Sequence, residues 1–102
     1  MEIALNFMGP GAKGTMRRIN ENGNVVGTIV VNCEGFPETT TLDSLTAATY
    51  STHMRNLSLA AANALKEIDV TDELVVLRLV SKKTEAVVAP DEEFHLIVVM
   101  RR

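Results

Sequence analysis

The sequence has little of what covalent or metal-based stabilisation requires. It contains one cysteine, so no disulfide can form within the chain. Its two histidines, His53 and His95, lie far apart in sequence, which argues against a structural zinc site. We therefore expect Cys33 to be a reduced thiol, buried or half-buried, and we expect no metal and no cofactor.

Long apolar runs and an excess of one charge are also absent. No apolar run reaches the roughly 18–20 residues that a membrane-spanning helix needs. The first eight residues lack the basic start and the apolar length of a signal peptide. Lys and Arg total 10 against 13 Asp and Glu, which excludes a broadly basic nucleic-acid-binding protein. These features predict a cytoplasmic protein whose partners are neither membranes nor nucleic acids.

The length and composition are those of one small folded domain. The chain has 102 residues, of which 46% are hydrophobic and 23% charged. Residues 1–14 contain the run Gly9-Pro10-Gly11, which interrupts any helix or central strand. We predict a Gly/Pro-containing leader over 1–14 and a domain over 15–102. A short helix at the start of that domain places Met16 and Ile19 on one side.

Strand-like segments alternate with short turns along the domain. Five segments are rich in apolar and β-branched residues: 25–33, 36–42, 74–80, 85–89 and 94–100. The first and the last are apolar on both faces, which predicts central strands covered on both sides. Pro37 lacks an N–H and places the second segment at an edge. Short turns require antiparallel pairing of consecutive strands.

A long helix is predicted from about residue 45 to residue 68, capped by Asp43 or Ser44. Its apolar side chains recur every three or four residues on one stripe. The stripe comprises Ala47, Tyr50, Met54, Leu57, Ala61, Ala64, Leu65 and Ile68. The predicted fold is α+β with element order α-β-β-α-β-β-β. Its five-stranded antiparallel sheet has the order 2-1-5-4-3, with the long helix on one face.

This order leaves the segment 74–80 at an edge of the sheet, with Arg78 as its one charge. Because an exposed apolar edge templates aggregation, we predict that it pairs with the same edge of a second copy about a two-fold axis. The alternative is that the leader or the first helix covers this edge. The predicted interface comprises Leu74, Val76, Arg78 and Val80 from the strand and Tyr50, Met54, Leu57 and Ala61 from the helix. For the helical residues, a core position and an interface position remain alternatives.

Several short motifs occur in register over about three-quarters of the chain. They are VVGTIVVN at 25–32, EGFP at 34–37, TTLD at 40–43, SKKTE at 81–85, VAPD at 88–91 and LIVV at 96–99. Together these motifs resemble the Roadblock family of dynein light chains. The resemblance implies a non-catalytic homodimer, or a heterodimer with another Roadblock light chain. In dynein, such a dimer binds a segment of the intermediate chain and helps to join cargo-binding subunits to the microtubule motor.

The resemblance also implies partner-binding residues and a location. Met16 and Ile19 belong to the first helix, which contributes to partner binding in the dynein members. The residues themselves add a basic group at the turn after the third strand, formed by Lys82 and Lys83 with Arg78. It can anchor an acidic partner segment, although lysines at a hairpin also protect against aggregation. The implied location is the cytoplasm, on the microtubule cytoskeleton. The alternative function is that of a Roadblock-fold scaffold or regulator of a small GTPase.

One motif points to a different function. The pattern Gly9-x-Gly11-x-x-Gly14, with Glu34 about 20 residues further on, matches a dinucleotide-binding fingerprint. However, the helix that follows has room for only two turns, and Pro10 removes a backbone N–H from the loop. A leader segment is therefore the preferred interpretation.

Catalytic candidates are few. His53 lies on the long helix without a nucleophile that can be placed beside it, and His95 alternates with apolar neighbours in a central strand. Asp91, Glu92 and Glu93 form an acidic turn that is best explained as a solvated connection. We therefore predict a protein that is not an enzyme.

Overall fold

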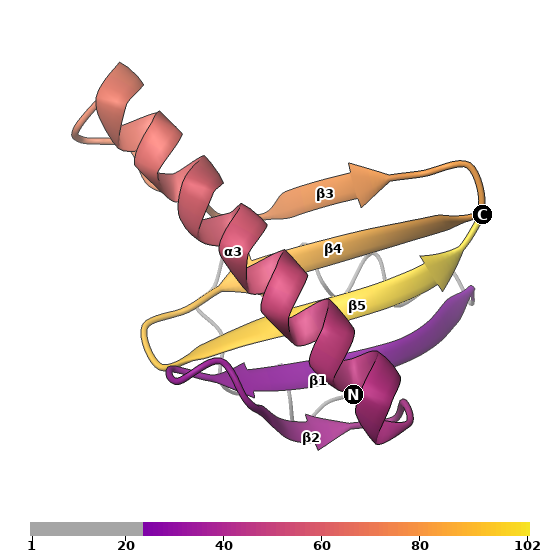
Figure 1. Ribbon diagram of the computed structural model, residues 1–102. Coiled ribbons are helices and arrows are strands. Elements are labelled where there is room, and N and C mark those ends of the chain that lie inside the picture. The colour runs from indigo at the N-terminus through magenta and orange to yellow at the C-terminus, as the bar shows by residue number, and fades with distance from the viewer. Residues whose placement is uncertain (1–23) are drawn as a thin grey trace.

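The computed structural model describes residues 24–102, which form an antiparallel sheet crossed by one helix (Figure 1). The elements are β1 (Val25–Asn32), β2 (Pro37–Thr40), α3 (Ser44–Ile68), β3 (Leu77–Val80), β4 (Thr84–Pro90) and β5 (Phe94–Arg101). The sheet order is β2-β1-β5-β4-β3, and every neighbouring pair is antiparallel. This confirms the predicted fold class. The predicted leader over 1–14 and the short helix with Met16 and Ile19 lie outside the described residues.

The two central strands are buried on both faces, as their composition predicts. In β5, Ile97 and Val98 point to opposite faces, and both are fully buried. In β1, Ile29 and Val30 also point to opposite faces, and they are 0% and 6% exposed. Because successive side chains alternate across a strand, both faces of the sheet contain a cluster of buried apolar residues.

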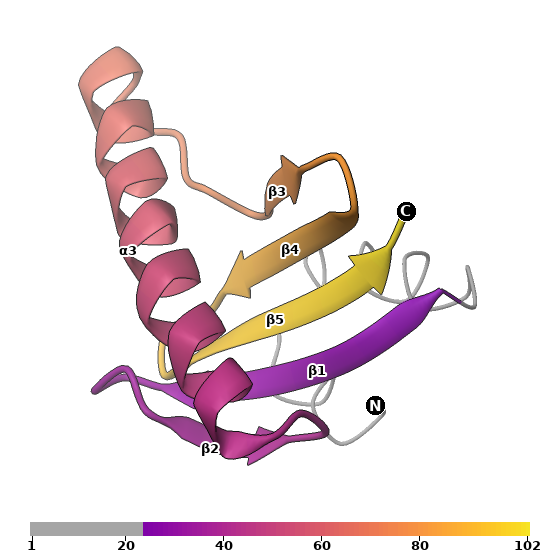
Figure 2. The same cartoon turned by 45° about the vertical axis from the view of Figure 1, so that its right-hand side comes forward.

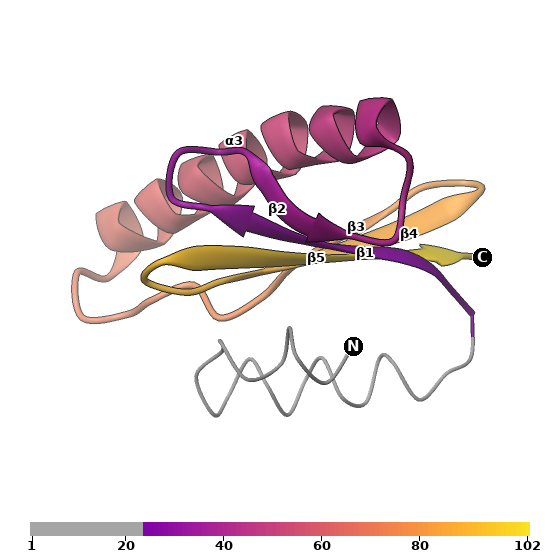
Figure 3. The same cartoon turned by 90° about the horizontal axis from the view of Figure 1, so that it is seen from below.

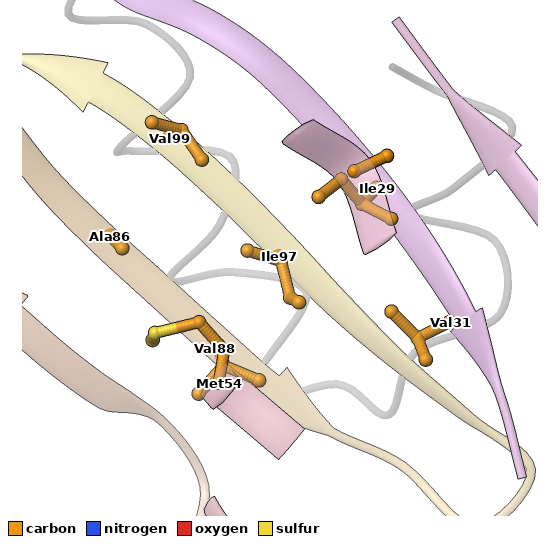
Figure 4. Packing of buried hydrophobic residues seen from close by; sticks show 8 residues of the cluster. Ile29, Val31, Met54, Ala86, Val88, Ile97 and Val99 are labelled. Carbon is orange, nitrogen blue, oxygen red and sulfur yellow. The ribbon is translucent and has the colours of Figure 1, made fainter. Parts of the chain in front are cut away.

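The cluster on the α3 face joins the helix to the sheet. Met54 of α3 packs against Ile29 and Val31 from β1, Ala86 and Val88 from β4, and Ile97 and Val99 from β5 (Figure 4). Ala47 of α3 belongs to the same cluster. Leu42, Tyr50 and Leu77 are partly buried against it. This contact fixes the position of α3 across the sheet.

The helix begins where its cap predicts. The carboxylate of Asp43 accepts a hydrogen bond from the backbone N–H of Thr46 at 3.0 Å. Hydrogen bonding from the side chain of Thr46, together with this backbone bond, lowers the pKa of Asp43. The buried face of α3 consists of Ala47, Ser51, Met54 and Ser58. Ser51 satisfies its hydroxyl by donating to the carbonyl of Ala47 at 2.6 Å. These mostly small side chains allow the helix backbone to lie close to the sheet.

The α3 helix is longer than the sheet is wide. Its N-terminal part lies over β1 and β2, and its C-terminal part extends past β3 (Figures 1 and 3). The chain then returns through residues 69–76 to the edge strand (Figure 2). The C-terminal part of α3 therefore has less of the sheet beneath it than the N-terminal part.

Two local predictions need correction. The third predicted strand, 74–80, begins only at Leu77. The register that pairs Leu77 with Val88 brings Val75 opposite Pro90, which has no N–H to donate, so pairing stops before it. Cys33 is exposed and not buried, because β1 ends at Asn32 and the chain turns there.

The turn after β1 depends on a glycine and an asparagine. Gly35 has a φ of +92°, a conformation that side chains disfavour. The side-chain oxygen of Asn32 accepts hydrogen bonds from the N–H groups of Glu34 and Phe36, both at 3.0 Å. An Asn that bonds the backbone ahead of it, followed by a glycine, thus fixes this turn.

The core assignment can be tested at Ile97, which is fully buried. Ile97→Ala should lower the free energy of unfolding by about 2–5 kcal/mol, because it removes apolar contacts and leaves a cavity. Urea unfolding followed by circular dichroism measures this change. Leu45→Ala, at a position that is 78% exposed, is the control and should change stability by less than about 0.5 kcal/mol. Similar losses in the two variants would contradict the assignment.

Candidate interaction surface

The outer edge of β3 is the most exposed part of the sheet. β3 pairs with β4 on one side, and no described strand pairs with its other side. Leu79 and Val80 are 48% and 47% exposed. The N–H and C=O groups along this side are therefore available to another strand, beside apolar side chains that water does not favour.

The opposite edge of the sheet, β2, is less suited to pairing with another strand and less apolar. It contains Pro37, which cannot donate a ladder hydrogen bond, and the charged Glu38. The Thr40 hydroxyl donates to the carbonyl of Thr28 at 2.9 Å, so it is satisfied within the sheet. β2 thus has features that prevent edge pairing, whereas β3 has no proline and its one charge, Arg78, is paired with Glu85 of the neighbouring strand.

Large exposed apolar side chains are concentrated around β3. Seven of the ten found in the described residues are Leu57, Leu59, Ile68, Val70, Val75, Leu79 and Val80. They come from the C-terminal half of α3, the connection 69–76 and β3 itself. We call these three segments together the edge surface. Apolar exposure that gathers in one stretch of a small domain is typical of an interface.

The structure divides the helical residues that were predicted at the interface. Met54 is 2% exposed and belongs to the core cluster, and Tyr50 is partly buried against the same cluster. Leu57 is 44% exposed and lies on the edge surface, while Ala61 is half-buried. Of the two alternatives left open by the sequence, Met54 thus occupies the core position and Leu57 the exposed one.

The predicted strand residues also differ among themselves. Leu74 and Val76 precede β3 and are half-buried, and Val76 packs against the cluster on the face opposite α3. Val80 is exposed at the end of β3. Arg78 is exposed and forms an ion pair with Glu85 at 2.7 Å, which raises the pKa of Arg78. Its charge therefore already has a partner within the chain.

The predicted basic turn is larger than the sequence indicated. Lys82 and Lys83 are exposed between β3 and β4. Arg102 lies beside them, because its N–H donates to the carbonyl of Lys83 at 3.1 Å and its guanidinium donates to Ser81 at 2.8 Å. Arg102 is distant in sequence, and only the antiparallel pairing of β4 and β5 brings it here. The predicted pairing of these two strands could have placed Arg102 beside Lys83, but the sequence analysis did not extend the pairing to the last residue.

His95 occupies a half-buried position near Arg55 of α3. Burial lowers the pKa of His95, and the positive charge of Arg55 lowers it further. The Arg55 guanidinium donates to the carbonyl of Cys33 at 3.1 Å. In the described part of the chain, His95 Nδ1 and Arg55 Nε are buried without a hydrogen-bond partner. Burial and the nearby guanidinium thus both favour the neutral form of the imidazole.

The remaining candidates from the sequence lie apart from one another. His53 is exposed on α3, and Asp91, Glu92 and Glu93 form the turn between β4 and β5. Within residues 24–102, no three His, Cys, Asp or Glu side chains are grouped so that they could hold a metal ion. The glycine motif at 9–14 lies outside the described residues. Among the described helices, none has the length and hydropathy needed to span a membrane.

The sequence model of the Roadblock/LC7 domain matches residues 12–101, which is most of the chain. The chain belongs to the Roadblock/LC7 family. A Roadblock/LC7 domain from Streptomyces avermitilis superposes with a TM-score of 0.72 at 15% identity, covering 78% of this chain and 68% of that one. MglB from Myxococcus xanthus superposes with a TM-score of 0.63 at 12% identity, covering 83% of this chain and 71% of MglB. An MglB structure with a tetrameric arrangement superposes with a TM-score of 0.62 at 14% identity, covering 91% of this chain and 74% of that one.

At these identities, the structural relatives demonstrate a shared Roadblock fold. Two of them come from bacteria, so the fold alone does not imply a dynein partner. The dynein role, the intermediate-chain partner and the microtubule location stay predictions. The boundary at residue 14 also stays a prediction.

The exposed edge predicts the effect of a charge on self-association. Val80→Lys should weaken dimerisation at least about tenfold, because it places a charge in an apolar contact that would lose water. Sedimentation velocity over a concentration series measures the dissociation constant. Val26→Lys is a matched control, since Val26 is a valine on β1 that is 48% exposed. Equal dimerisation of the two variants would exclude this edge as the interface.

The neutral environment of His95 predicts a pH-dependent stability. Because folding lowers the pKa of His95 below its ordinary 6.5, the unfolded chain binds more protons once the pH falls toward that value. The free energy of unfolding should therefore fall as the pH drops from about 7.5 through 6.5, until the folded histidine also protonates.

Urea unfolding at about pH 7.5 and about pH 5.5 measures this dependence. His95→Gln should reduce it, while His53→Gln, at the exposed histidine of α3, should retain it. A pH dependence unchanged in His95→Gln would contradict the assignment.

Proposed function

We propose that this Roadblock/LC7 protein is a non-catalytic dimeric platform that scaffolds or regulates a small GTPase. The observation that carries the proposal is the edge surface, where an unpaired strand edge lies beside seven exposed apolar side chains. A two-fold axis at β3 joins two five-stranded sheets into one and covers that edge. It also brings the C-terminal halves of the two α3 helices close together.

The mechanism we propose requires binding and no chemistry. A dimer of this kind presents two copies of each surface, related by the two-fold axis, to a partner. If the platform binds one nucleotide state of a GTPase more tightly than the other, it shifts the population toward that state. Regulation then follows from this difference in affinity, and no side chain of the platform has to act on the nucleotide.

Two observations weigh against the dynein intermediate chain as the partner and so support the alternative function. In the dynein members, the first helix contributes to partner binding, and here Gly9, Pro10 and Gly11 stand in that part of the sequence. Relatives from bacteria have the same fold, so the fold by itself does not require a dynein partner. The residues that characterise the fold are therefore retained, while those nearest the dynein-type contact are altered.

The proposal predicts a partner that distinguishes nucleotides. Purified protein should bind at least one small GTPase from its own organism, with affinities for the GDP-bound and GTP-analogue-bound forms that differ at least about tenfold. Biolayer interferometry against a panel of loaded GTPases measures this. A recombinant dynein intermediate-chain segment, tested in parallel, is the competing probe. Binding of that segment and of no GTPase would establish the dynein function in place of the one proposed.

A further inference from the structure

Unpaired charges of opposite sign stand at the two ends of the edge strand. Lys82 and Lys83 are exposed in the turn that follows β3. Asp72 and Glu73 are exposed in the connection that precedes it. In the part of the chain that the structure describes, the one ion pair is Arg78–Glu85, so none of these four side chains is paired.

Within one copy, these charges are kept apart by the strand between them. β3 has 4 residues, which span about 13 Å at the usual rise per residue. The connection from α3 and the turn to β4 lie at opposite ends of this edge (Figure 1). Lys82 and Lys83 therefore lie out of reach of the acidic pair of their own chain.

A two-fold axis across β3 exchanges the two ends. If the axis passes between Arg78 and Leu79, Leu77 of one copy lies opposite Val80 of the other. Lys82 and Lys83 lie in the turn directly beyond Val80, so they come near the segment that precedes Leu77 in the second copy, residues 74–76. The acidic pair of that copy comes directly before those residues, within reach of two long lysine side chains.

We infer that Lys82 and Lys83 of each copy form ion pairs with Asp72 and Glu73 of the other, and that these pairs set the register of the dimer. The inference rests on the dimer in the proposed function and identifies the acidic segment that the basic turn recognises. The symmetry makes the contact twice in each dimer. A slip of the two strands by two residues would move each lysine pair about 7 Å from its partner.

Local hydrogen bonds distinguish the acidic pair from its neighbour Asp69. The Asp69 carboxylate is occupied, because it accepts bonds from the N–H and the hydroxyl of Thr71 at 3.0 and 2.7 Å. The Lys66 ammonium donates to the backbone carbonyls of Val70 and Asp72. Lys66 thus ties the connection to the end of α3 through the backbone. The carboxylate of Glu73 and the outer oxygen of Asp72 remain available to the second copy.

Charge reversal tests this pairing. The double variant Lys82→Glu/Lys83→Glu and the double variant Asp72→Lys/Glu73→Lys should each raise the dissociation constant of the homodimer at least about tenfold at low salt, since attraction becomes repulsion at both contacts. An equimolar mixture of the two should associate as tightly as the wild type, because each contact then joins opposite charges. Sedimentation velocity at about 0.05 M and about 0.5 M NaCl measures this, and the differences should shrink at high salt.

Controls separate this inference from the proposed function. Glu34→Lys/Glu38→Lys makes the same charge change as the acidic-pair variant at the opposite edge of the sheet, at and before β2, and should leave dimerisation unchanged. Circular dichroism verifies that each variant is folded. A wild-type protein that is monomeric would overturn both the dimer and this inference. A wild-type dimer whose two charge variants associate normally, or whose weakened variants fail to recover on mixing, would overturn the inference alone.

Discussion

The pairing of β5 with both β1 and β4 is the interaction on which the rest of this structure depends. Seven Cα pairs join β5 to each neighbour, and the side chains of β5 that pack into the two buried clusters lie on opposite faces. A strand buried on both faces and paired on both sides cannot lie at an edge. The edges therefore fall to β2 and β3. Of these two, β2 has proline, threonine and an exposed charge, whereas β3 is apolar apart from Arg78, and no described strand pairs with its outer side.

Helix length then determines how far the edge surface extends. A helix of 25 residues is about 37 Å long, whereas five strands at their usual spacing are about 19 Å across. The N-terminal half of α3 is held by the core cluster through Ala47 and Met54. The C-terminal half continues beyond the sheet, and the chain must return from there to begin β3. One geometric mismatch thus produces both the exposed helix end and the apolar connection beside the open edge.

Topology could be predicted from the sequence because it rests on features that are local. Short turns specify antiparallel neighbours, and the apolar faces of 25–33 and 94–100 specify which strands are central. Features that depend on distant residues could not be predicted in the same way. The buried face of α3 passes through Ser51 and Ser58, which an apolar pattern leaves out, and their small size matters only against the sheet.

The candidate surface could be predicted less completely for the same reason. β3 is shortened by Pro90, a residue of a different strand, because it removes the hydrogen bond that Val75 would need. Met54 and Leu57 are three residues apart on one predicted stripe, yet one is in the core and the other is exposed. The apolar stripe places both residues on the same side of the helix. Which of them faces the sheet depends on the rotation of the helix, and small side chains in its buried face set that rotation.

An edge that is merely apolar is a poor recognition surface, because burial of apolar area has no direction and favours many registers. The edge surface avoids this through the placement of its charges. Opposite charges at the two ends of β3 repel a parallel copy, which would bring like ends together, and attract an antiparallel one. A second Roadblock chain could replace the identical copy only if it had an acidic pair before its own edge strand and a basic pair after it. In the dimer that we propose, the residues that orient the two copies therefore also select the partner.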